Sequence, residues 1–365
     1  MKILKIIESM SMEEGGPPEV ARNLKNFFYG SNIKIHIFSY TKMNSLLFFY
    51  LLFSRKKKLK FFKFLKKFDI IHFHQLWSLK SMLIIYFAKK LSVKYIFISH
   101  GYLDDWSLNE KKYKKLIFIK FFLQKAINGA YGFFFSTIDE YNDAMQNITF
   151  NNFFVIPNGI DLQVYHKKKY QDKTRKKISF FGRVHKKKGI EILLDAIKLL
   201  PDHFFEKFYF EITGPGKPAY VDEIKNKIID LDISNKVSLK KPISRDKKIN
   251  YLNTADVFIL PSFEEGDSIA LKEAMAIGMP VLISKQCRLN IVEEASAGYV
   301  METNKESILE NLLKLLNSDL ETMGNNARQL IVDKFDNIDC AKRLEKIYVD
   351  IYTCSKNSKD WINED

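Results

Sequence analysis

Short runs of β-branched and aromatic residues recur along the whole chain, and helix-length amphipathic segments separate several of them. Continuous apolar runs of this length are typical of parallel strands that are covered on both faces. The runs are 3–7, 33–38, 70–73, 95–99, 133–136, 153–156, 178–181, 209–213, 237–239, 257–260 and 281–284. The pattern therefore predicts an α/β chain with two successive Rossmann-like, doubly wound domains that face each other across a central cleft.

A polar, lysine-rich stretch near the middle of the chain marks the expected domain boundary. It covers residues 165–177 and follows a turn-forming Pro-Asn-Gly at 157–159. We expect the first domain to span residues 1–165 and the second residues 166–340, because 365 residues are enough for two cores. A helical pattern near the end of the chain predicts a terminal helix within 341–365.

Residues 261–280, PSFEEGDSIALKEAMAIGMP, follow an apolar run and combine a polar loop with the signals of a helix. Ser268 is suited to cap a helix that starts at Ile269, and the glycine and proline near the end of the segment terminate it. Glu265 then lies in the loop at the carboxyl end of a strand, and Glu273 lies in the second helical turn. Two carboxylates beside the electropositive start of a helix, at the carboxyl edge of a parallel sheet, predict a site for a sugar nucleotide.

A second loop, rich in glycine and lysine, follows the strand expected at 178–181. Its sequence, FFGRVHKKKG over 180–189, contains Gly182, Arg183 and Lys188. Basic side chains in such a loop can bind the phosphates of a nucleotide, because a planar guanidinium can bridge two phosphoryl oxygens and an ammonium adds a compact charge. We interpret Arg183 and Lys188 in this way, whereas a solvated basic loop is the simpler interpretation of the two lysines before Lys188.

Together these loops resemble the signature of the retaining GT-B glycosyltransferases of the family 4 type, also described as glycosyl transferases group 1. That signature has a G-R-x-x-x-x-K-G loop, and later Pro-Ser, a Glu, seven residues and a second Glu within E-A-M-A-x-G-x-P. Arg183 and Lys188 match the two basic positions, and Glu265 and Glu273 match the two acidic positions. Asp267-Ser268 departs from the family, which usually has Phe-Gly here, so the shape around the donor sugar is expected to differ.

The resemblance implies transfer of a sugar from a nucleotide-sugar donor with retention of the anomeric configuration. The diphosphate would lie against Arg183, Lys188 and the start of the helix, Glu273 would bind the ribose, and Glu265 would contact the donor sugar. His100, in SHGYLDDW after the strand at 95–99, would position that sugar. The implied catalytic residues are thus His100, Arg183, Lys188 and Glu265. The implied donor-binding residues are Gly16, Gly182, Arg183, Lys188, Gly214, Glu265, Gly266, Ile269, Ala270 and Glu273.

The resemblance also implies that the terminal helix crosses back to the first domain, and that the acceptor is a glycan or a lipid-linked glycan of bacterial-type surface polysaccharide assembly. Two other functions remain open on the sequence alone. A sugar-nucleotide 2-epimerase shares the fold and acts on a free nucleotide sugar, although 261–273 fits it less well. A non-catalytic glycan- or membrane-binding relative is the other alternative, but the acidic and basic positions named above are all present.

The net charge of +15 is concentrated in the first half of the chain. Residues 1–160 contain 24 Lys and Arg against 11 Asp and Glu, whereas residues 161–365 contain 34 against 32. Basic and apolar side chains are mixed in 46–67 and in 111–125, a composition suited to an anionic membrane surface. The alternative is that these lysines lie on a solvated face and the aromatic residues in the core. We find no nucleic-acid recognition motif and expect no nucleic-acid partner.

The cysteines, the apolar runs and the first residues of the chain indicate in which cellular compartment the protein is expected. Cys287, Cys340 and Cys354 are scattered, which predicts no disulfide framework and suits a reducing cytoplasm. No apolar run approaches the ~20 residues needed to span a bilayer, and the first residues lack the features of a signal peptide. We therefore expect a cytoplasmic protein, peripheral on the inner face of the cell membrane.

Two further pairs of residues are given structural interpretations. Asp230 and Asp232 have the spacing of a metal-binding pair, but they are expected to close a helix, so we expect neither a metal nor another cofactor. His72 and His74, in IHFHQLWS, are expected to face opposite sides of a sheet and to have structural roles.

Overall fold

The computed structural model describes residues 1–7, 21–39 without 23, 26 and 29, 54–109, 112–171 and 173–354. Some residues named in the sequence-based predictions lie outside this described part of the chain, namely Gly16, 46–53 and Lys111. The chain divides into two compact units, one formed by Met1–Asn158 with Ile338–Asp365 and the other by Gly159–Asn337.

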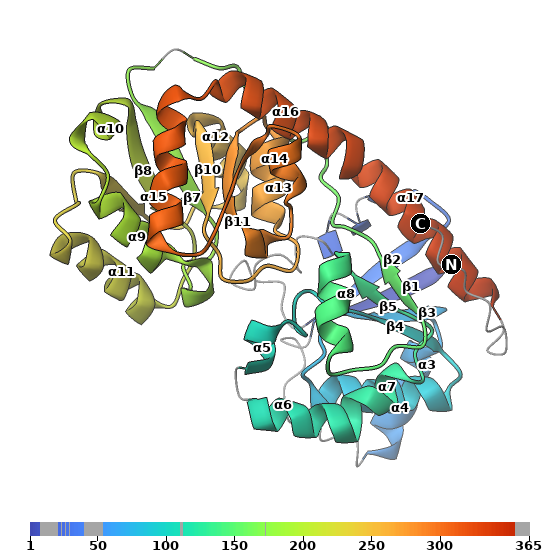
Figure 1. The fold of residues 1–365 in the computed structure, drawn as a ribbon. Helices are drawn as coiled ribbons and strands as arrows, with labels where there is room; N and C mark the ends of the chain where they lie inside the picture. Colours follow the sequence, from blue (N-terminus) through green and yellow to red (C-terminus); the bar gives the residue numbers. More distant parts are fainter. Residues whose placement is uncertain are drawn as a thin grey trace. The chain divides into compact units, whose positions relative to one another are not determined.

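The first unit contains a parallel sheet with the strand order β2-β1-β3-β4-β5-β6 (Figure 1). Its strands are β1 (Lys2–Ile7), β2 (Lys34–Ser39), β3 (Ile70–Phe73), β4 (Lys94–Ile98), β5 (Phe133–Phe135) and β6 (Phe153–Val155). Its helices include α3 (Arg55–Leu65), α4 (Leu79–Lys90), α5 (Asp105–Asn109), α6 (Lys112–Phe118), the π-helix η3 (Ile119–Leu123), α7 (Gln124–Ile127), α8 (Ile138–Met145) and α17 (Asn337–Thr353).

Successive side chains of a strand point to opposite sides of the sheet. In this sheet, apolar side chains are buried on both sides. On one face Ile70 and Ile96 are buried in a cluster that includes Tyr348 of α17. On the other face Phe97 is buried in a cluster that includes Phe87 of α4. The central strands of the first sheet are therefore covered on both faces, as their uninterrupted apolar runs predict, whereas the edge strands β2 and β6 are only partly buried.

The second unit contains a parallel sheet with the order β12-β11-β10-β7-β8-β9. Its strands are β7 (Lys176–Phe181), β8 (Phe208–Thr213), β9 (Val237–Lys240), β10 (Val257–Leu260), β11 (Val281–Ser284) and β12 (Gly298–Met301). Its α-helices are α9 (Ile190–Lys198), α10 (Asp202–Lys207), α11 (Pro218–Asp230), α12 (Arg245–Thr254), α13 (Ile269–Ala276), α14 (Ile291–Glu294), α15 (Lys305–Lys314) and α16 (Leu320–Lys334). Strand β12 was not expected, because GYVM is short and begins with glycine.

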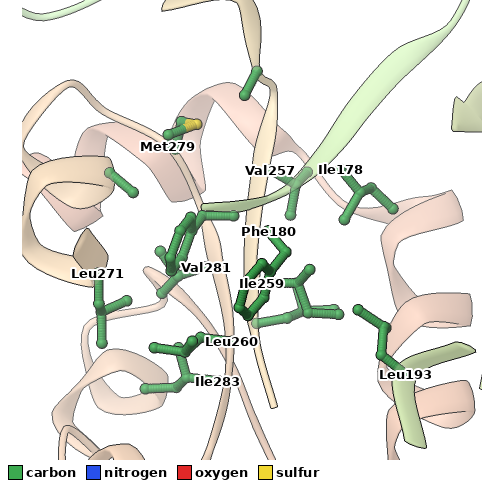
Figure 2. Packing of buried hydrophobic residues seen from close by; sticks show 14 of the residues in the cluster. Ile178, Phe180, Leu193, Val257, Ile259, Leu260, Leu271, Met279, Val281 and Ile283 are labelled. Carbon is green, nitrogen blue, oxygen red and sulfur yellow. The ribbon is translucent and has the colours of Figure 1, made fainter. Parts of the chain in front are cut away.

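Helices cover both faces of the second sheet. Helix α9 lies beside α11 and α15, and α13 lies beside α16 (Figure 1). Figure 2 shows Leu193 of α9 and Leu271 of α13 on opposite sides of the central strands, which contribute Phe180, Ile259 and Ile283 to the same core. Burying both faces removes most of the apolar surface of these strands from water, which is the main favourable contribution to folding.

The units divide at Asn158/Gly159 and Asn337/Ile338, not at the expected 165/166 and 340/341. Residues 159–165 belong to the second unit because the amide of Ile160 donates to the carbonyl of Phe335, at 2.8 Å, and because Ile160 and Tyr165 are buried in that unit's core. The terminal helix α17 belongs to the first unit, where Tyr348 and Ile351 are fully buried. In the described part of the chain, no helix combines the length and the apolar composition that crossing a bilayer requires.

Candidate functional site

Four loops at the carboxyl edge of the second sheet form the candidate site. They follow β7, β8, β10 and β11, and the order of the strands reverses between β7 and β10. In open α/β sheets, ligands bind at the carboxyl ends of the strands beside such a reversal. Hydrogen bonds join the loops: Val184 N donates to Pro215 O, Phe263 N to Lys187 O and Glu265 N to Gln286 O, at 2.8, 2.8 and 3.1 Å. The loops therefore support one another through their backbones.

Two glycines allow these loops to approach closely. Gly189 has a φ of +66°, and a Cβ atom there would come within 2.0 Å of the carbonyl oxygen of Pro261. Gly214 has a φ of +153°, and its Cβ would come within 1.7 Å of the carbonyl oxygen of Gly182. Both distances are far shorter than any van der Waals contact, so these positions need glycine.

The loop after β7 and the loop after β10 bring Lys188 and Glu265 together. The two side chains form an ion pair that leaves only 14% of the lysine and 9% of the glutamate side chain exposed. Ser262 Oγ donates to the same carboxylate oxygen at 2.6 Å. Burial alone would raise the pKa of Glu265, but the charge of Lys188 and these hydrogen bonds outweigh it, so its pKa is lowered. Glu265 is therefore an ionised, oriented carboxylate.

Helix α13 begins next to this pair. Ser268 caps it by accepting a hydrogen bond from Leu271 N, as expected from the sequence. Gly266 follows Glu265 in the loop, and Ile269 and Ala270 occupy the first helical turn, where backbone amides have no acceptor within the helix. An anionic group can accept hydrogen bonds from such amides.

Asp267, where this sequence departs from the signature of the family that it resembles, has a buried partner. The Asp267 carboxylate forms an ion pair with Lys272 at 2.5 Å, and the two side chains are 5% and 2% exposed. The Lys272 ammonium also lies 4.0 Å from the centre of the Phe335 ring. A buried charge needs a partner of opposite sign, so the two residues are interdependent, and the pair ties the start of α13 to its second turn.

Glu273 is almost fully buried, and its partners come from distant segments. Its Oε1 accepts hydrogen bonds from Tyr165 Oη and from Lys248 Nζ, both at 2.5 Å. Tyr165 and Lys248 lie 108 and 25 residues away in the sequence. No local pattern identifies these two residues, which sequence reasoning missed.

Arg183, the other basic residue predicted for this site, differs from Lys188 because it is not buried. Arg183 is exposed, and its side chain makes no hydrogen bond or ion pair with the residues that the structure describes. Glu264 forms an ion pair with Arg288, which the sequence analysis did not single out. The geometry thus unites Lys188, Glu265 and Ser262, and leaves Arg183 at the solvent-exposed margin of the same loops.

His100 belongs to the first unit and follows β4. It has a φ of +50°, an uncommon backbone conformation for a residue other than glycine, and Gly101 next to it has a φ of +73°. Glu140 of α8 stabilises this turn, because its carboxylate accepts hydrogen bonds from Gly101 N at 2.5 Å and from Ser136 N at 2.7 Å. Residues held in rare conformations cluster at functional sites.

The expectation that His72 and His74 face opposite sides of the sheet is wrong. Residues two apart on a strand share a face, and the two rings lie side by side with their centres 4.6 Å apart. Both are buried, together with Lys5 of β1. Burial is the main reason why the pKa of Lys5 is lowered to about 7 and that of His100 to about 3.

Comparison with known proteins identifies the family. The model of Glycosyltransferase Family 4 matches residues 12–164, and the model of Glycosyl transferases group 1 matches residues 163–330. The chain belongs to the group 1 glycosyltransferases. The predicted family and enzyme class are therefore confirmed.

Relatives of this glycosyltransferase agree with that assignment. It is 26% identical over 212 residues to the UDP-Gal:alpha-D-GlcNAc-diphosphoundecaprenol alpha-1,3-galactosyltransferase of Escherichia coli, and the match spans 54% of each chain, about half of the relative's length. Sucrose-phosphate synthase from Thermosynechococcus elongatus superposes with a TM-score of 0.78 at 16% identity, over 97% of this chain and 100% of that one. Anabaena HepE in complex with UDP-glucose superposes with a TM-score of 0.74 at 16% identity, over 96% and 99%. These structural likenesses confirm the predicted two-domain GT-B fold.

Asp230 and Asp232, which have the spacing of a metal-binding pair, lie at the end of a helix in the glycosyltransferase. Asp230 closes α11, and Asp232 follows in a turn with a φ of +53°. Among the residues described here, no group of three or more His, Cys, Asp or Glu side chains could hold a metal ion.

Proposed function

We propose that this glycosyltransferase moves a sugar from a nucleotide-sugar donor to a glycan or lipid-linked acceptor, with retention of the anomeric configuration. The observation that carries the proposal is the buried Lys188–Glu265 pair with Ser262, located at the strand-order reversal and beside the start of α13. A pre-arranged cation and free helix amides are what a departing diphosphate requires, because its negative charge grows in the transition state. A UDP-sugar is the first donor to test, given the UDP-glucose complex of the Anabaena relative.

Each residue takes a distinct role in this proposal. Lys188 and the amides of Ile269 and Ala270 hold the diphosphate, and Arg183, exposed and without a partner among the described residues, closes on it from the margin of the loop. Glu265 accepts hydrogen bonds from hydroxyls of the donor sugar, and Glu273, held by Tyr165 and Lys248, accepts them from the ribose. No protein nucleophile is assigned: Lys188 and Ser262 already engage Glu265, and no other carboxylate is proposed to contact the reacting carbon.

The donor test uses purified protein with UDP-, GDP- and ADP-sugars, alone and with an undecaprenyl-diphosphate-linked GlcNAc acceptor. We expect release of one nucleoside diphosphate, faster with acceptor, and a product of unchanged anomeric configuration by NMR.

EDTA is expected to leave the rate of sugar transfer unchanged, because we propose that the enzyme needs no metal ion. A rate that depends on added Mg²⁺ or Mn²⁺ would contradict this proposal. Epimerised donor without diphosphate release would identify an epimerase instead, and an inverted product would refute retention.

We also propose that the first unit binds an anionic membrane surface at the inner face of the cell membrane. Tyr113, Ile117 and Phe121 are 83%, 58% and 63% exposed and follow one another at intervals of four residues, about one helical turn, along α6 and η3. Exposed lysines of the same segment, Lys112, Lys114, Lys120 and Lys125, surround them. An apolar stripe bordered by lysines suits the boundary between lipid headgroups and acyl chains.

Helix α3, by contrast, fits the simpler alternative for the other basic segment. Its Phe61, Phe62 and Phe64 pack against the core, while Lys56 and Lys60 are exposed. We therefore assign the apolar part of the membrane contact to α6 and η3, and only an electrostatic contribution to α3.

Vesicle binding tests this surface. Wild-type protein is expected to co-sediment with vesicles of equal parts phosphatidylglycerol and phosphatidylcholine, less at high salt but not to zero, because each lysine contributes about 1 kcal/mol that salt screens. The variant with Tyr113, Ile117 and Phe121 changed to Ser should lose the salt-resistant part. Ile229→Ser is the matched control, since Ile229 is 58% exposed on α11 of the second unit. Wild-type protein that ignores these vesicles at low salt would refute the membrane surface.

A further inference from the structure

The imidazole of His100 makes a specific contact that the sequence motif does not show. His74 Nδ1 and His100 Nε2 are 2.8 Å apart and share a hydrogen bond, and the ring centres are 4.9 Å apart. One ring nitrogen of His100 is therefore engaged by His74. Its other nitrogen, Nδ1, makes no hydrogen bond to the residues that the structure describes and is available to a substrate hydroxyl.

His74 is itself supported from two sides. Its amide donates to the carbonyl of Ile6 on β1 at 2.8 Å, which fixes the backbone just beyond β3. Its ring lies against that of His72, and His72 Nδ1 is 2.8 Å from the hydroxyl of Tyr348 on α17. A chain of buried groups thus runs from α17 through His72 and His74 to His100, all within the first unit.

The hydrogen bond between the two imidazoles also constrains the protons. A hydrogen bond between two ring nitrogens contains one proton, so one ring donates and the other accepts. Burial is the largest cause that lowers the pKa of His74 and of His100, and the nearby charge of Lys5 lowers both further. Both rings are therefore neutral at neutral pH, and their tautomers are coupled: the nitrogen of His100 that carries its single proton depends on whether His74 donates or accepts in the shared hydrogen bond.

We propose that His74 is a positioning residue that holds the His100 imidazole in one tautomer and one orientation, ready to hydrogen-bond a hydroxyl of a sugar substrate. The effect on turnover rests on the proposed function, whereas the effect on the tautomer does not. Neutral His100 then acts as an oriented hydrogen-bonding group and not as an imidazolium acid.

The tautomer is measured first, on the protein without substrate. Two-dimensional NMR of protein labelled with ¹⁵N in its seven histidines separates protonated from unprotonated ring nitrogens, and a His100→Ala variant assigns the signals. In wild-type protein we expect one tautomer for His100. In His74→Leu we expect averaged signals, as for an imidazole that exchanges between tautomers. In His74→Asn we expect one tautomer again, because one end of the asparagine amide, either its NH2 donor or its oxygen acceptor, occupies the position of Nδ1 and faces His100.

Turnover of the best donor from the sugar-nucleotide screen is measured next. His74→Leu is expected to lower kcat about 10- to 100-fold, with little change in KM, because a misplaced group costs this much when its geometry matters. His74→Asn should recover most of the loss. In a His100→Ala background, His74→Leu should cause no further loss, because His74 acts only through His100.

Three results would overturn the inference. The first is a single, unchanged tautomer of His100 in His74→Leu. The second is unchanged turnover in that variant. The third is an equal loss with and without His100, which would mean that His74 supports the fold instead. Failure of every donor in wild-type protein would refute the proposed function, and the NMR result would still decide whether His74 sets the state of His100.

Discussion

Replacing Lys188 by alanine is expected to lower the turnover of the glycosyltransferase about 10²- to 10³-fold, the usual loss when one group that stabilises transition-state charge is removed. Lys188 is a buried cation whose ion-pair partner, Glu265, lies in the loop that leads into α13. Its contribution is expected to exceed that of an exposed lysine, because charges interact more strongly away from water. Lys186→Ala is the control, since Lys186 is two residues away and its side chain is 65% exposed.

The partner of Lys188 has to be considered in the same experiment. Without the lysine, the buried Glu265 carboxylate loses its ion-pair partner, and breaking a buried pair in this way costs about 3–5 kcal/mol of stability. The variant that combines Lys188→Met with Glu265→Gln removes both charges, so we expect it to recover stability but not turnover. Full turnover in a correctly folded Lys188→Ala protein would show that this lysine has no part in the reaction.

Replacing Lys5 by methionine is expected to stabilise the first unit at pH 7 and to remove a pH dependence from it. Lys5 is fully buried on β1, opposite His72 of β3, and its Nζ has no hydrogen-bond partner among the described residues. Burial lowers its pKa from 10.5 to about 7. Between these values the unfolded chain binds a proton that the folded chain does not, so the free energy of unfolding rises with pH, by about 1.4 kcal/mol per pH unit.

Below pH 7 both states carry the proton, and this contribution to the pH dependence disappears. The total effect is on the order of 4–5 kcal/mol, and methionine keeps an unbranched stem of similar length without the amine. The measurement is denaturant unfolding at pH 7, 8 and 9, followed by tryptophan fluorescence. That signal reports the first unit, because Trp77 and Trp106 belong to it and the second unit contains no tryptophan.

Lys2→Met is the matched control, because Lys2 lies on the same strand but is exposed. The difference in unfolding free energy between wild type and Lys5→Met should shrink steadily as the pH rises, while that for Lys2→Met stays constant. A difference for Lys5→Met that does not change with pH would mean that the amine remains protonated in the folded protein.

The sequence by itself determined the strands, the parallel sheets and the family. Eleven of the strands were expected within one or two residues of their observed bounds, because a strand buried on both faces needs an apolar run that local composition displays. The capped helix α13 after Glu265 was also visible, since Ser268 and Gly278 signal a helix start and end through their own backbone chemistry.

Only the tertiary structure decided which charged residues meet. Lys188 and Glu265 are 77 residues apart, and Tyr165 and Glu273 are 108 apart, so their contacts depend on strand order and not on any local pattern. The pairing of His74 with His100 likewise arises because β3 and β4 are neighbours in the sheet and their carboxyl ends meet at one edge. A lysine can be solvated, as Lys2 is, or buried with no hydrogen-bond partner among the described residues, as Lys5 is. Which of the two occurs depends on which face of the sheet is covered, and distant elements such as α17 provide that cover.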